Sequence, residues 1–273
     1  MWTFARRKTA TIRTDEGRTA WRRVRLLGCD IDPLTFRETV NEVDRLIQVG
    51  EPVQHCVINA AKVVMLHADS RLREIAAGCQ LVNVDGQSVV WASKLLGHPL
   101  PERVAGIDLF LALMGLAARR GYSTYFLGAR PEVVKKVGAR ARMEHPQLHI
   151  AGMHDGYFSA DETGAVVEAI RKVAPDMLFV GMPSPKKEYW LAENLERLGV
   201  PFTMGVGGSF DVYAGITKRA PLWVQRCGLE WAVRLLQEPR RMWKRYLISN
   251  TRFSWLVLKE FLNSRCPGGW PAG

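Results

Sequence analysis

The stretch Leu81-Val-Asn-Val-Asp-Gly-Gln-Ser-Val-Val-Trp-Ala-Ser-Lys-Leu-Leu96 decides the fold. Residues 81–84 are apolar apart from one asparagine and predict a short buried strand, and residues 89–96 have apolar side chains near helical spacing. Between them, Asp85 and Gly86 stand at the carboxyl end of the strand. In an open parallel sheet, ligands bind at that edge. The stretch therefore predicts a strand–turn–helix unit with a carboxylate at the ligand-binding edge.

Asp85 has two interpretations. Asp-Gly is a common turn pair, and the pair alone favours a simple turn. A carboxylate at a strand end, followed by a glycine that lets another group approach the backbone, is also well placed to accept a proton from a bound hydroxyl group. The rest of the chain has to decide between the turn and a catalytic base.

The alternation of strands and helices extends over most of the chain. Strands are predicted at residues 24–27, 53–59, 81–84, 122–127, 148–153, 177–182 and 202–206. Helices are predicted at residues 33–49, 61–77, 89–96, 109–119, 161–173 and 186–198, with a further one that starts at Pro131. This order predicts an α/β fold, a Rossmann-like and mostly parallel sheet with helices on both faces.

The first of these helices has an ambiguous start. Asp30 and Asp32 have the spacing of a pair that could hold a divalent ion. Asp32 also precedes Pro33, and an aspartate followed by proline is typical of a helix N-cap with proline in the first turn. We favour the cap and expect no metal site and no cofactor.

The composition indicates a globular protein that binds a polyanion. The chain has 273 residues, 47% of them hydrophobic, and a formal net charge of +11. A strongly basic balance favours nucleic acid, anionic lipid or a phosphate-rich substrate as partner. The five scattered cysteines contain no CxxC pair, which argues against disulfides and zinc. No apolar run approaches the ~20 residues of a spanning helix.

The chain divides by composition into three parts. Residues 1–23 are basic and polar and are expected to form a flexible tail, and residues 24–214 are expected to form the α/β domain. In residues 215–273, cations alternate with tryptophan and leucine, as in Leu229-Glu-Trp-Ala-Val-Arg-Leu-Leu. This predicts a basic helical appendage for an anionic membrane surface, with ordinary core packing as the alternative.

Two predicted strand ends are rich in glycine. Gly128 precedes the helix that starts at Pro131, and Gly207 lies within Gly205-Val-Gly-Gly-Ser-Phe-Asp211. Such ends can hold a diphosphate through backbone N–H groups. Neither matches a dinucleotide fingerprint or a P-loop, which disfavours an NAD-dependent oxidoreductase. A non-catalytic nucleic-acid-binding protein is suggested only by the charge, since no such motif is present.

Several ordered motifs resemble the WecG/TagA/CpsF glycosyltransferases. They are Asn83-Val-Asp-Gly, Pro101-Glu-Arg-Val-Ala-Gly-Ile-Asp, His154-Asp-Gly-Tyr-Phe, Gly205-Val-Gly-Gly-Ser-Phe-Asp, Lys218-Arg-Ala-Pro, Gly228-Leu-Glu-Trp and Glu238-Pro-Arg-Arg. The resemblance implies an inverting, metal-independent transfer of a hexose from a UDP-sugar to a polyprenyl-diphosphate-linked sugar. It places the protein peripherally at the cytoplasmic face of the bacterial inner membrane, in surface polysaccharide or exopolysaccharide synthesis. It implies no nucleic acid as partner and leaves a homo-oligomer open.

The resemblance also assigns roles to individual residues. Asp85 matches the family's proposed general base, which now favours the catalytic interpretation over the turn. The substrate-binding residues that the family pattern and the glycine-rich ends imply are Asn59, Arg103, Gly128, Lys187, Gly207 and Asp211. Those implied to meet the lipid diphosphate or the membrane are Arg234, Arg240, Arg241 and Arg245.

The sequence departs from the family pattern at two pocket positions. Val57 stands where members of the TagA branch have a threonine, and Lys187 stands where the family commonly has glutamine. Because both departures separate the chain from the aminosugar branches, we favour glucose as the donor sugar over N-acetylmannosamine or its uronic acid. Lys187 has an alternative interpretation as an exposed lysine at the start of a helix.

Overall fold

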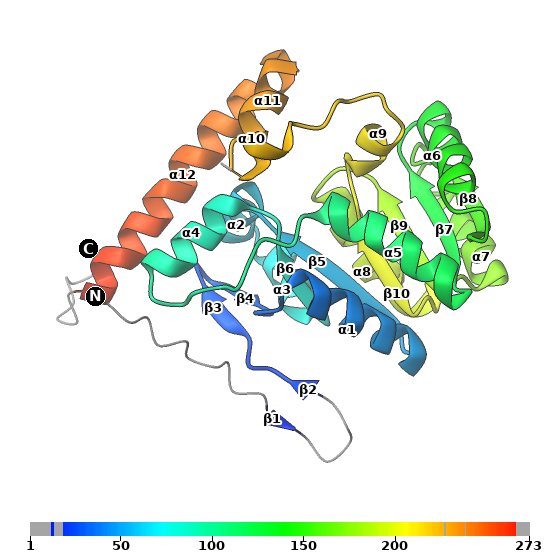
Figure 1. Ribbon diagram of the computed structural model, residues 1–273, viewed down its shortest axis with the longest axis horizontal. Helices are drawn as coiled ribbons and strands as arrows, with labels where there is room; N and C mark the ends of the chain where they lie inside the picture. Colours follow the sequence, from blue (N-terminus) through cyan, green and yellow to red (C-terminus); the bar gives the residue numbers. More distant parts are fainter. Residues whose placement is uncertain (1–11, 14–18, 227, 238, 266–273) are drawn as a thin grey trace.

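The computed structural model describes residues 12–13, 19–226, 228–237 and 239–265. Six parallel strands form its central sheet in the spatial order β6-β5-β10-β9-β7-β8 (Figure 1). In chain order, they are β5 (Val53–Ile58), β6 (Leu81–Val84), β7 (Ser123–Gly128), β8 (His149–His154), β9 (Met177–Gly181) and β10 (Phe202–Gly205). The predicted α/β fold with a parallel sheet is confirmed.

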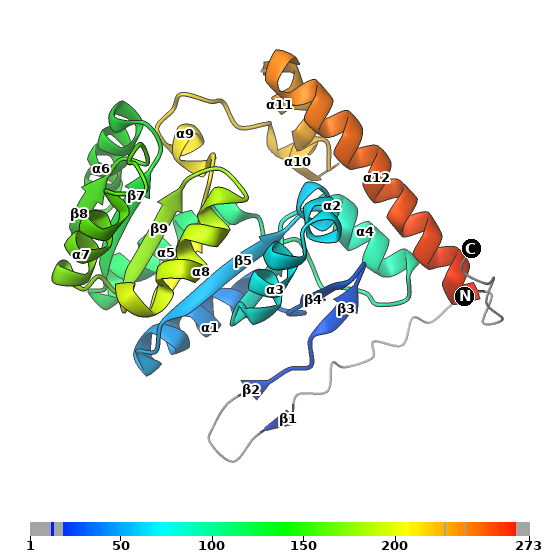
Figure 2. The ribbon, with the colours of Figure 1, turned by 180° about the vertical axis from the view of Figure 1, so that it is seen from behind.

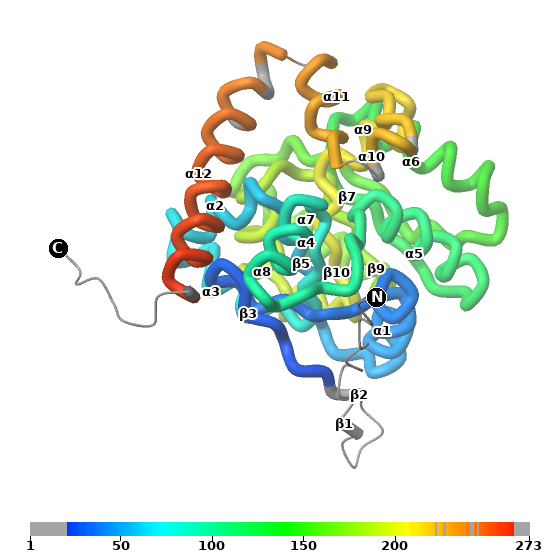
Figure 3. The backbone as a smooth tube through the Cα atoms, turned by 60° about the vertical axis from the view of Figure 1, so that its left-hand side comes forward, coloured from blue at the N-terminus to red at the C-terminus, as the bar shows by residue number. Residues whose placement is uncertain are grey.

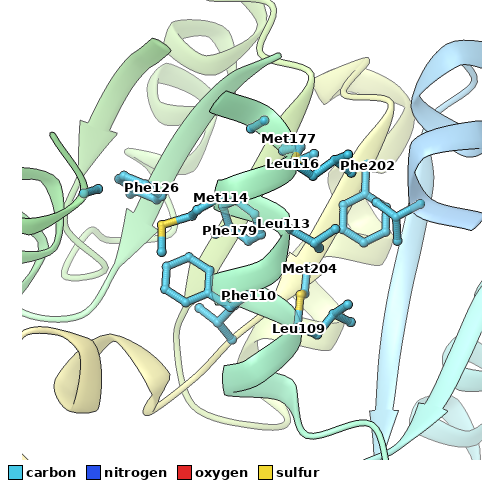
Figure 4. Packing of buried hydrophobic residues seen from close by; sticks show 14 of the residues in the cluster. Leu109, Phe110, Leu113, Met114, Leu116, Phe126, Met177, Phe179, Phe202 and Met204 are labelled. Atoms are coloured by element: carbon cyan, nitrogen blue, oxygen red, sulfur yellow. The ribbon is translucent and has the colours of Figure 1, made fainter. Parts of the chain in front are cut away.

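Helices cover both faces of the sheet (Figures 1 and 2). On one face lie α1 (Phe36–Val49), α5 (Gly106–Arg120) and α6 (Pro131–Glu144), and on the other lie α3 (Ser70–Gly78), α7 (Thr163–Val173) and α8 (Lys186–Leu198). Figure 4 shows the packing under α5, where Phe110 lies edge-on to Phe179 of β9 at a ring-centroid distance of 4.9 Å. Full burial of such side chains contributes about 1.5–3 kcal/mol each.

A short hairpin precedes the sheet and is fixed to it by Asp32. The hairpin consists of β3 (Val24–Leu26) and β4 (Cys29–Ile31). The buried Asp32 carboxylate accepts hydrogen bonds from the indole of Trp21, from Arg23 and from the backbone N–H of Val82 in β6. Its oxygens are thus engaged with three donors, and the side chain does not cap a helix.

The helix cap lies three residues further on. Thr35 is the N-cap of α1, and its side chain and that of Glu38 form a capping box. The prediction of Asp32 as the cap was therefore wrong. The pattern Thr35-x-x-Glu38 is itself a sequence signature of a helix start. The helix starts there because the carboxylate of Asp32 is already bonded to residues of the hairpin region and of β6.

The long helix predicted at 61–77 is divided in two. Helix α2 (Ala60–Ala68) ends at Asp69, whose side chain caps α3 by accepting a hydrogen bond from the N–H of Leu72. The remaining elements are α4 (Gln87–Leu95), α9 (Ser209–Tyr213) and the pairs of residues in β1 (Ile12–Arg13) and β2 (Thr19–Ala20). Residues 1–11 and 14–18 of the expected tail lie outside the described residues.

The C-terminal segment forms three helices, α10 (Leu222–Arg226), α11 (Glu230–Gln237) and α12 (Pro239–Arg265). The long helix α12 runs along α2, as Figure 3 shows, and it inserts Phe253 into the buried cluster beside β5 and β6. No helix within the described part of the chain is long and apolar enough to cross a membrane. The segment packs on the α/β core through α12 and also reaches the carboxyl edge of the sheet through α11.

Candidate active site

A cleft of about 1040 Å³ opens at the carboxyl ends of the strands, between the sheet and the C-terminal segment. The loops after β5, β6, β9 and β10 form its floor, and α11 contributes one wall. The sequence-predicted residues that line the cleft are Asn59, Asp85, Arg103, Lys187, Gly207, Asp211 and Arg234. Seven residues spread over 176 positions of the sequence, 59 to 234, thus share one cavity.

Asp85 is held at the end of β6 by close packing with the neighbouring strand end. Its backbone N–H donates to the carbonyl of Ile58 at 2.9 Å. A Cβ atom at Gly86 would lie 3.3 Å from the Cα of Asn59, tighter than ordinary contact. The glycine after Asp85 therefore lets the ends of β5 and β6 approach each other, and this approach brings Asn59 and Asp85 to the same wall of the cleft.

The surroundings of Asp85 are typical of a general base. Burial, and secondarily the charge of Glu230, raise the pKa of this carboxyl group from its ordinary value near 3.8 to about 6, against the opposing effects of Arg103, the N–H of Gly106 and Arg234. A base with a pKa slightly below neutrality is ionised at neutral pH and still accepts a proton well. The site can therefore deprotonate a bound hydroxyl group.

The same pKa shift predicts an effect on stability. Because the folded state binds the Asp85 proton more tightly than the unfolded state does, the stabilising contribution is present below about pH 4 and is lost as the pH rises to about 6. We expect Asp85→Asn to raise the free energy of unfolding at pH 7.5 by about 1–3 kcal/mol and to leave it unchanged at pH 4. Urea unfolding at the two pH values measures this; a loss of stability at pH 7.5 would contradict it.

A charged network joins the cleft to the C-terminal segment. Arg103 donates to Glu230 of α11 at 3.1 Å, and Glu230 also lies 3.8 Å from Arg219. Arg219 in turn makes two hydrogen bonds to Asp108, of 2.6 and 2.7 Å. The network ties α11 to the start of α5, and it places both carboxylates and guanidinium groups close to Asp85.

Lys187 lies on the floor of the cleft. Its side chain is 15% exposed, and its ammonium group lies 3.5 Å from Glu188. The interpretation as an exposed lysine at a helix start was therefore wrong, although the residue does lie in the first turn of α8. The side chain crosses Gly205, where an added Cβ would lie 2.6 Å from the Lys187 Cε, so the glycine at the end of β10 leaves room for the lysine in this position.

The glycine-rich strand ends differ in their position. Gly207 lines the cleft and Asp211, in α9, lies beside it. Gly128 does not line the cleft, although its neighbours Ala129 and Arg130 do. Gly128 has a φ of +111°, and an added Cβ would lie 2.9 Å from the backbone of Gly181, so close strand packing explains this glycine.

The arginines of the C-terminal segment fall into two groups. Arg234 lines the cleft, and its guanidinium group lies 3.4 Å from the position of a Cβ on Gly208. Arg240 is exposed at the start of α12 and does not line the cleft. The side chains of Arg241 and Arg245 lie outside the part of the chain whose side chains the structure describes.

Several cleft residues were not predicted from the sequence. Glu230 and Arg219 stand within motifs that resemble the family, and Lys62 pairs with Glu188 at 2.5 Å. Glu230 is an acidic residue in a basic segment, and that contrast is the signal that would have singled it out. Among the described residues, no group of three or more His, Cys, Asp and Glu side chains is arranged to hold a metal ion.

Comparison with known proteins places this chain in a family. The model of the WecG/TagA/CpsF glycosyl transferase family matches residues 24–267. An N-acetylglucosaminyldiphosphoundecaprenol N-acetyl-beta-D-mannosaminyltransferase of Bacillus subtilis is 36% identical over 192 residues, which cover 70% of this chain and 73% of the relative. A protein of the same name from Bacillus spizizenii is 35% identical over 190 residues, 70% of this chain and 72% of the relative.

The relatives bear on one expectation from the sequence. Both are named for the transfer of an N-acetylated aminosugar, and neither is a glucosyltransferase. The two relatives therefore give no support to the preference for glucose, which rested on Val57 and Lys187. The family match spans the sheet, the cleft and the three C-terminal helices together, and on this ground the chain belongs to the WecG/TagA/CpsF family of glycosyltransferases.

Proposed function

We propose that this protein transfers N-acetylmannosamine from a UDP-sugar to N-acetylglucosamine linked to undecaprenyl diphosphate, with inversion at the anomeric carbon. The observation that carries the proposal is Asp85, a carboxyl group with a pKa of about 6 in a cleft large enough for a sugar nucleotide. The names of the two relatives support the choice of donor sugar and acceptor.

The reaction is a single displacement. Asp85 accepts the proton of the acceptor hydroxyl group, whose oxygen forms a bond to the anomeric carbon as the bond from that carbon to the UDP oxygen breaks. The proton ends on the Asp85 carboxylate, and the electron pair leaves with the diphosphate. Asn59, beside Asp85 on the neighbouring strand end, is placed to orient the acceptor.

The departing diphosphate requires positive charge. Arg103, Lys187 and Arg234 line the cleft and supply cations to it. Arg103 shares its charge with Glu230. Glu188, the carboxylate beside Lys187, is already paired with Lys62, so Lys187 and Arg234 are the stronger sources. We propose that these side chains balance the leaving group without a metal ion, so that activity persists in the presence of a chelator.

The base predicts the acidic limb of the pH profile. Because a protonated Asp85 cannot accept the acceptor proton, kcat/KM should fall about tenfold per pH unit below about pH 6 and reach a plateau above it. Initial rates between pH 4.5 and 8 with both substrates measure this limb. A rate independent of pH across this range would contradict the role of Asp85.

A membrane surface is the proposed site of action, because an undecaprenyl chain stays in the bilayer. Helix α12 has an exposed apolar stripe that consists of Trp243, Leu247, Trp255, Leu258 and Leu262. Exposed cations border this α12 stripe, among them Arg240, Lys244, Arg252 and Lys259. Tryptophan with flanking cations suits the headgroup region of an anionic leaflet, and we place this surface at the cytoplasmic face of the bacterial inner membrane.

A donor panel tests the proposed function. The enzyme is incubated with undecaprenyl-diphosphate-linked N-acetylglucosamine and, in turn, with the UDP derivatives of N-acetylmannosamine, its uronic acid, glucose and N-acetylglucosamine, with and without a chelator. Mass spectrometry then identifies the lipid product. The proposal expects an added N-acetylmannosamine as the main product; a product from another donor, or from none, would reject it.

A further inference from the structure

Two buried lysines share one carboxylate on the floor of the cleft. The Lys62 ammonium lies 2.5 Å from Oε1 of Glu188, and the Lys187 ammonium lies 3.5 Å from the same oxygen. The three side chains are 6%, 15% and 8% exposed for Lys62, Lys187 and Glu188. Two positive charges thus meet one negative charge in a region from which water is largely excluded.

The charges of this triad are oriented toward the cleft. Lys62 and Lys187 line the cleft, whereas Glu188 lies behind them and lines a separate cavity of about 20 Å³. Burial alone would raise the pKa of Glu188, but the two ammonium groups outweigh it and hold this pKa below its ordinary value. The carboxylate is therefore ionised at neutral pH. Burial lowers the pKa of Lys187 and the charge of Glu188 opposes that shift, so a second anion on the cleft side would favour the charged ammonium.

The small cavity behind the triad is polar and has room for one water molecule. Glu188 Oε2 and His55 Nδ1 are buried, have no hydrogen-bond partner, and belong to residues that line this cavity. A cavity of this size can hold one water molecule. Burial lowers the pKa of His55 to about 4, so the imidazole is neutral and adds no charge behind Lys187.

The position of Lys187 relative to Asp85 fits a donor phosphate. Lys187 crosses the end of β10, Asp85 follows β6, and β5 lies between these two strands. Neighbouring strands are about 4.8 Å apart, so the ends of β6 and β10 stand about 10 Å apart across the sheet. That separation accommodates one hexose ring, with the base on one side of it and the cation on the other.

We propose that Lys62, Lys187 and Glu188 form a cationic subsite that binds an anionic oxo group of the donor, and the geometry points to the diphosphate of the sugar nucleotide. The proposal deepens the proposed function, because it names the group that holds the donor. A buried ammonium group that lacks full compensation is costly, and phosphate oxygens supply the missing negative charge. A carboxylate on the donor sugar has the same chemistry and is the other source to be tested.

The test is the affinity for UDP and for uridine, measured by calorimetry and by ligand-observed NMR. Lys187→Gln and Lys187→Met remove the charge, and Lys62 still pairs with Glu188, so both variants should fold. A lost hydrogen bond to a charged group corresponds to a roughly ten- to hundredfold weaker affinity for UDP. Uridine, which has no phosphate, should bind all proteins equally. Lys172→Gln, which changes an exposed lysine of α7, is the matched control.

A second pair of ligands separates the two sources of negative charge. UDP-glucuronate and UDP-glucose differ only in a carboxylate at C6 of the sugar. If Lys187 binds that carboxylate, the variants lose a preference of the wild type for UDP-glucuronate and keep their affinity for UDP. If neither the UDP affinity nor this preference changes, the subsite does not exist. Because these measurements need no acceptor and no turnover, they stand even if mannosaminyl transfer fails.

Discussion

Replacing Asp85 by asparagine lowers kcat by about two to four orders of magnitude. Asparagine preserves the shape of the side chain at the end of β6 but cannot accept the proton of the acceptor hydroxyl group. Because the change leaves Arg103, Lys187 and Arg234 in place, the affinity for UDP should change little. Initial rates with saturating donor and acceptor give kcat, and calorimetry gives the dissociation constant of UDP.

Asp161→Asn is the control for this substitution, because Asp161 is exposed in the turn before α7 and does not line the cleft. This control variant should leave both kcat and the dissociation constant of UDP unchanged. The increase in stability expected for Asp85→Asn at pH 7.5 shows that the loss of rate does not come from unfolding. Turnover of this variant within a few-fold of the wild type would eliminate Asp85 as the base.

The α12 stripe gives the second large effect. The triple variant Trp255→Ser, Leu258→Ser and Leu262→Ser should bind anionic vesicles roughly a hundredfold more weakly. A side chain that is half inserted into the bilayer contributes about 1 kcal/mol, or half of what full burial gives. Three such losses add up to about 3 kcal/mol, which corresponds to a roughly hundredfold weaker affinity for the vesicles. Rates with lipid-linked acceptor should fall in parallel, while the affinity for UDP stays constant. Vesicle co-sedimentation and the transfer assay measure the two effects.

Point substitutions are a better test here than removal of the whole segment. Deletion of α12 would uncover α2 and remove Phe253 from the core, so lost activity would have two explanations. The control changes Met143 and Val173, exposed apolar residues of α6 and α7, to serine. Equal loss of vesicle binding in the control would show that general surface hydrophobicity, and not this stripe, mediates membrane contact.

The sheet was predictable because local patterns determine it. Buried runs such as Leu81–Val84 and Met177–Gly181 are short, apolar and bounded by glycine or aspartate, and their alternation with helices admits few arrangements. Asp85 was predictable for the same reason, since a strand end in a parallel sheet faces the ligand. The helix starts failed where a polar residue had a distant partner, as Asp32 has in Val82.

The contacts of the site depend on long-range packing and left little trace in the sequence. Glu230 meets Arg103 across 127 positions, and Glu188 meets Lys62 across 126. No periodic pattern in the sequence indicates such pairs, because each of these charged residues, taken alone, is of a type that usually lies on the solvated surface. Lys187 shows the consequence. Its neighbours Lys186 and Glu188 suggest an exposed helix start, and only Gly205 reveals that the side chain lies across β10.

The anomeric configuration of the transferred sugar tests the central claim most directly. Wild-type enzyme is mixed with UDP-N-acetylmannosamine and undecaprenyl-diphosphate-linked N-acetylglucosamine, and the product is isolated and examined by NMR. A single displacement with Asp85 as the base predicts a new linkage whose configuration is opposite to that of the donor. A product with the configuration of the donor would require a covalent intermediate or another mechanism, and it would contradict the account.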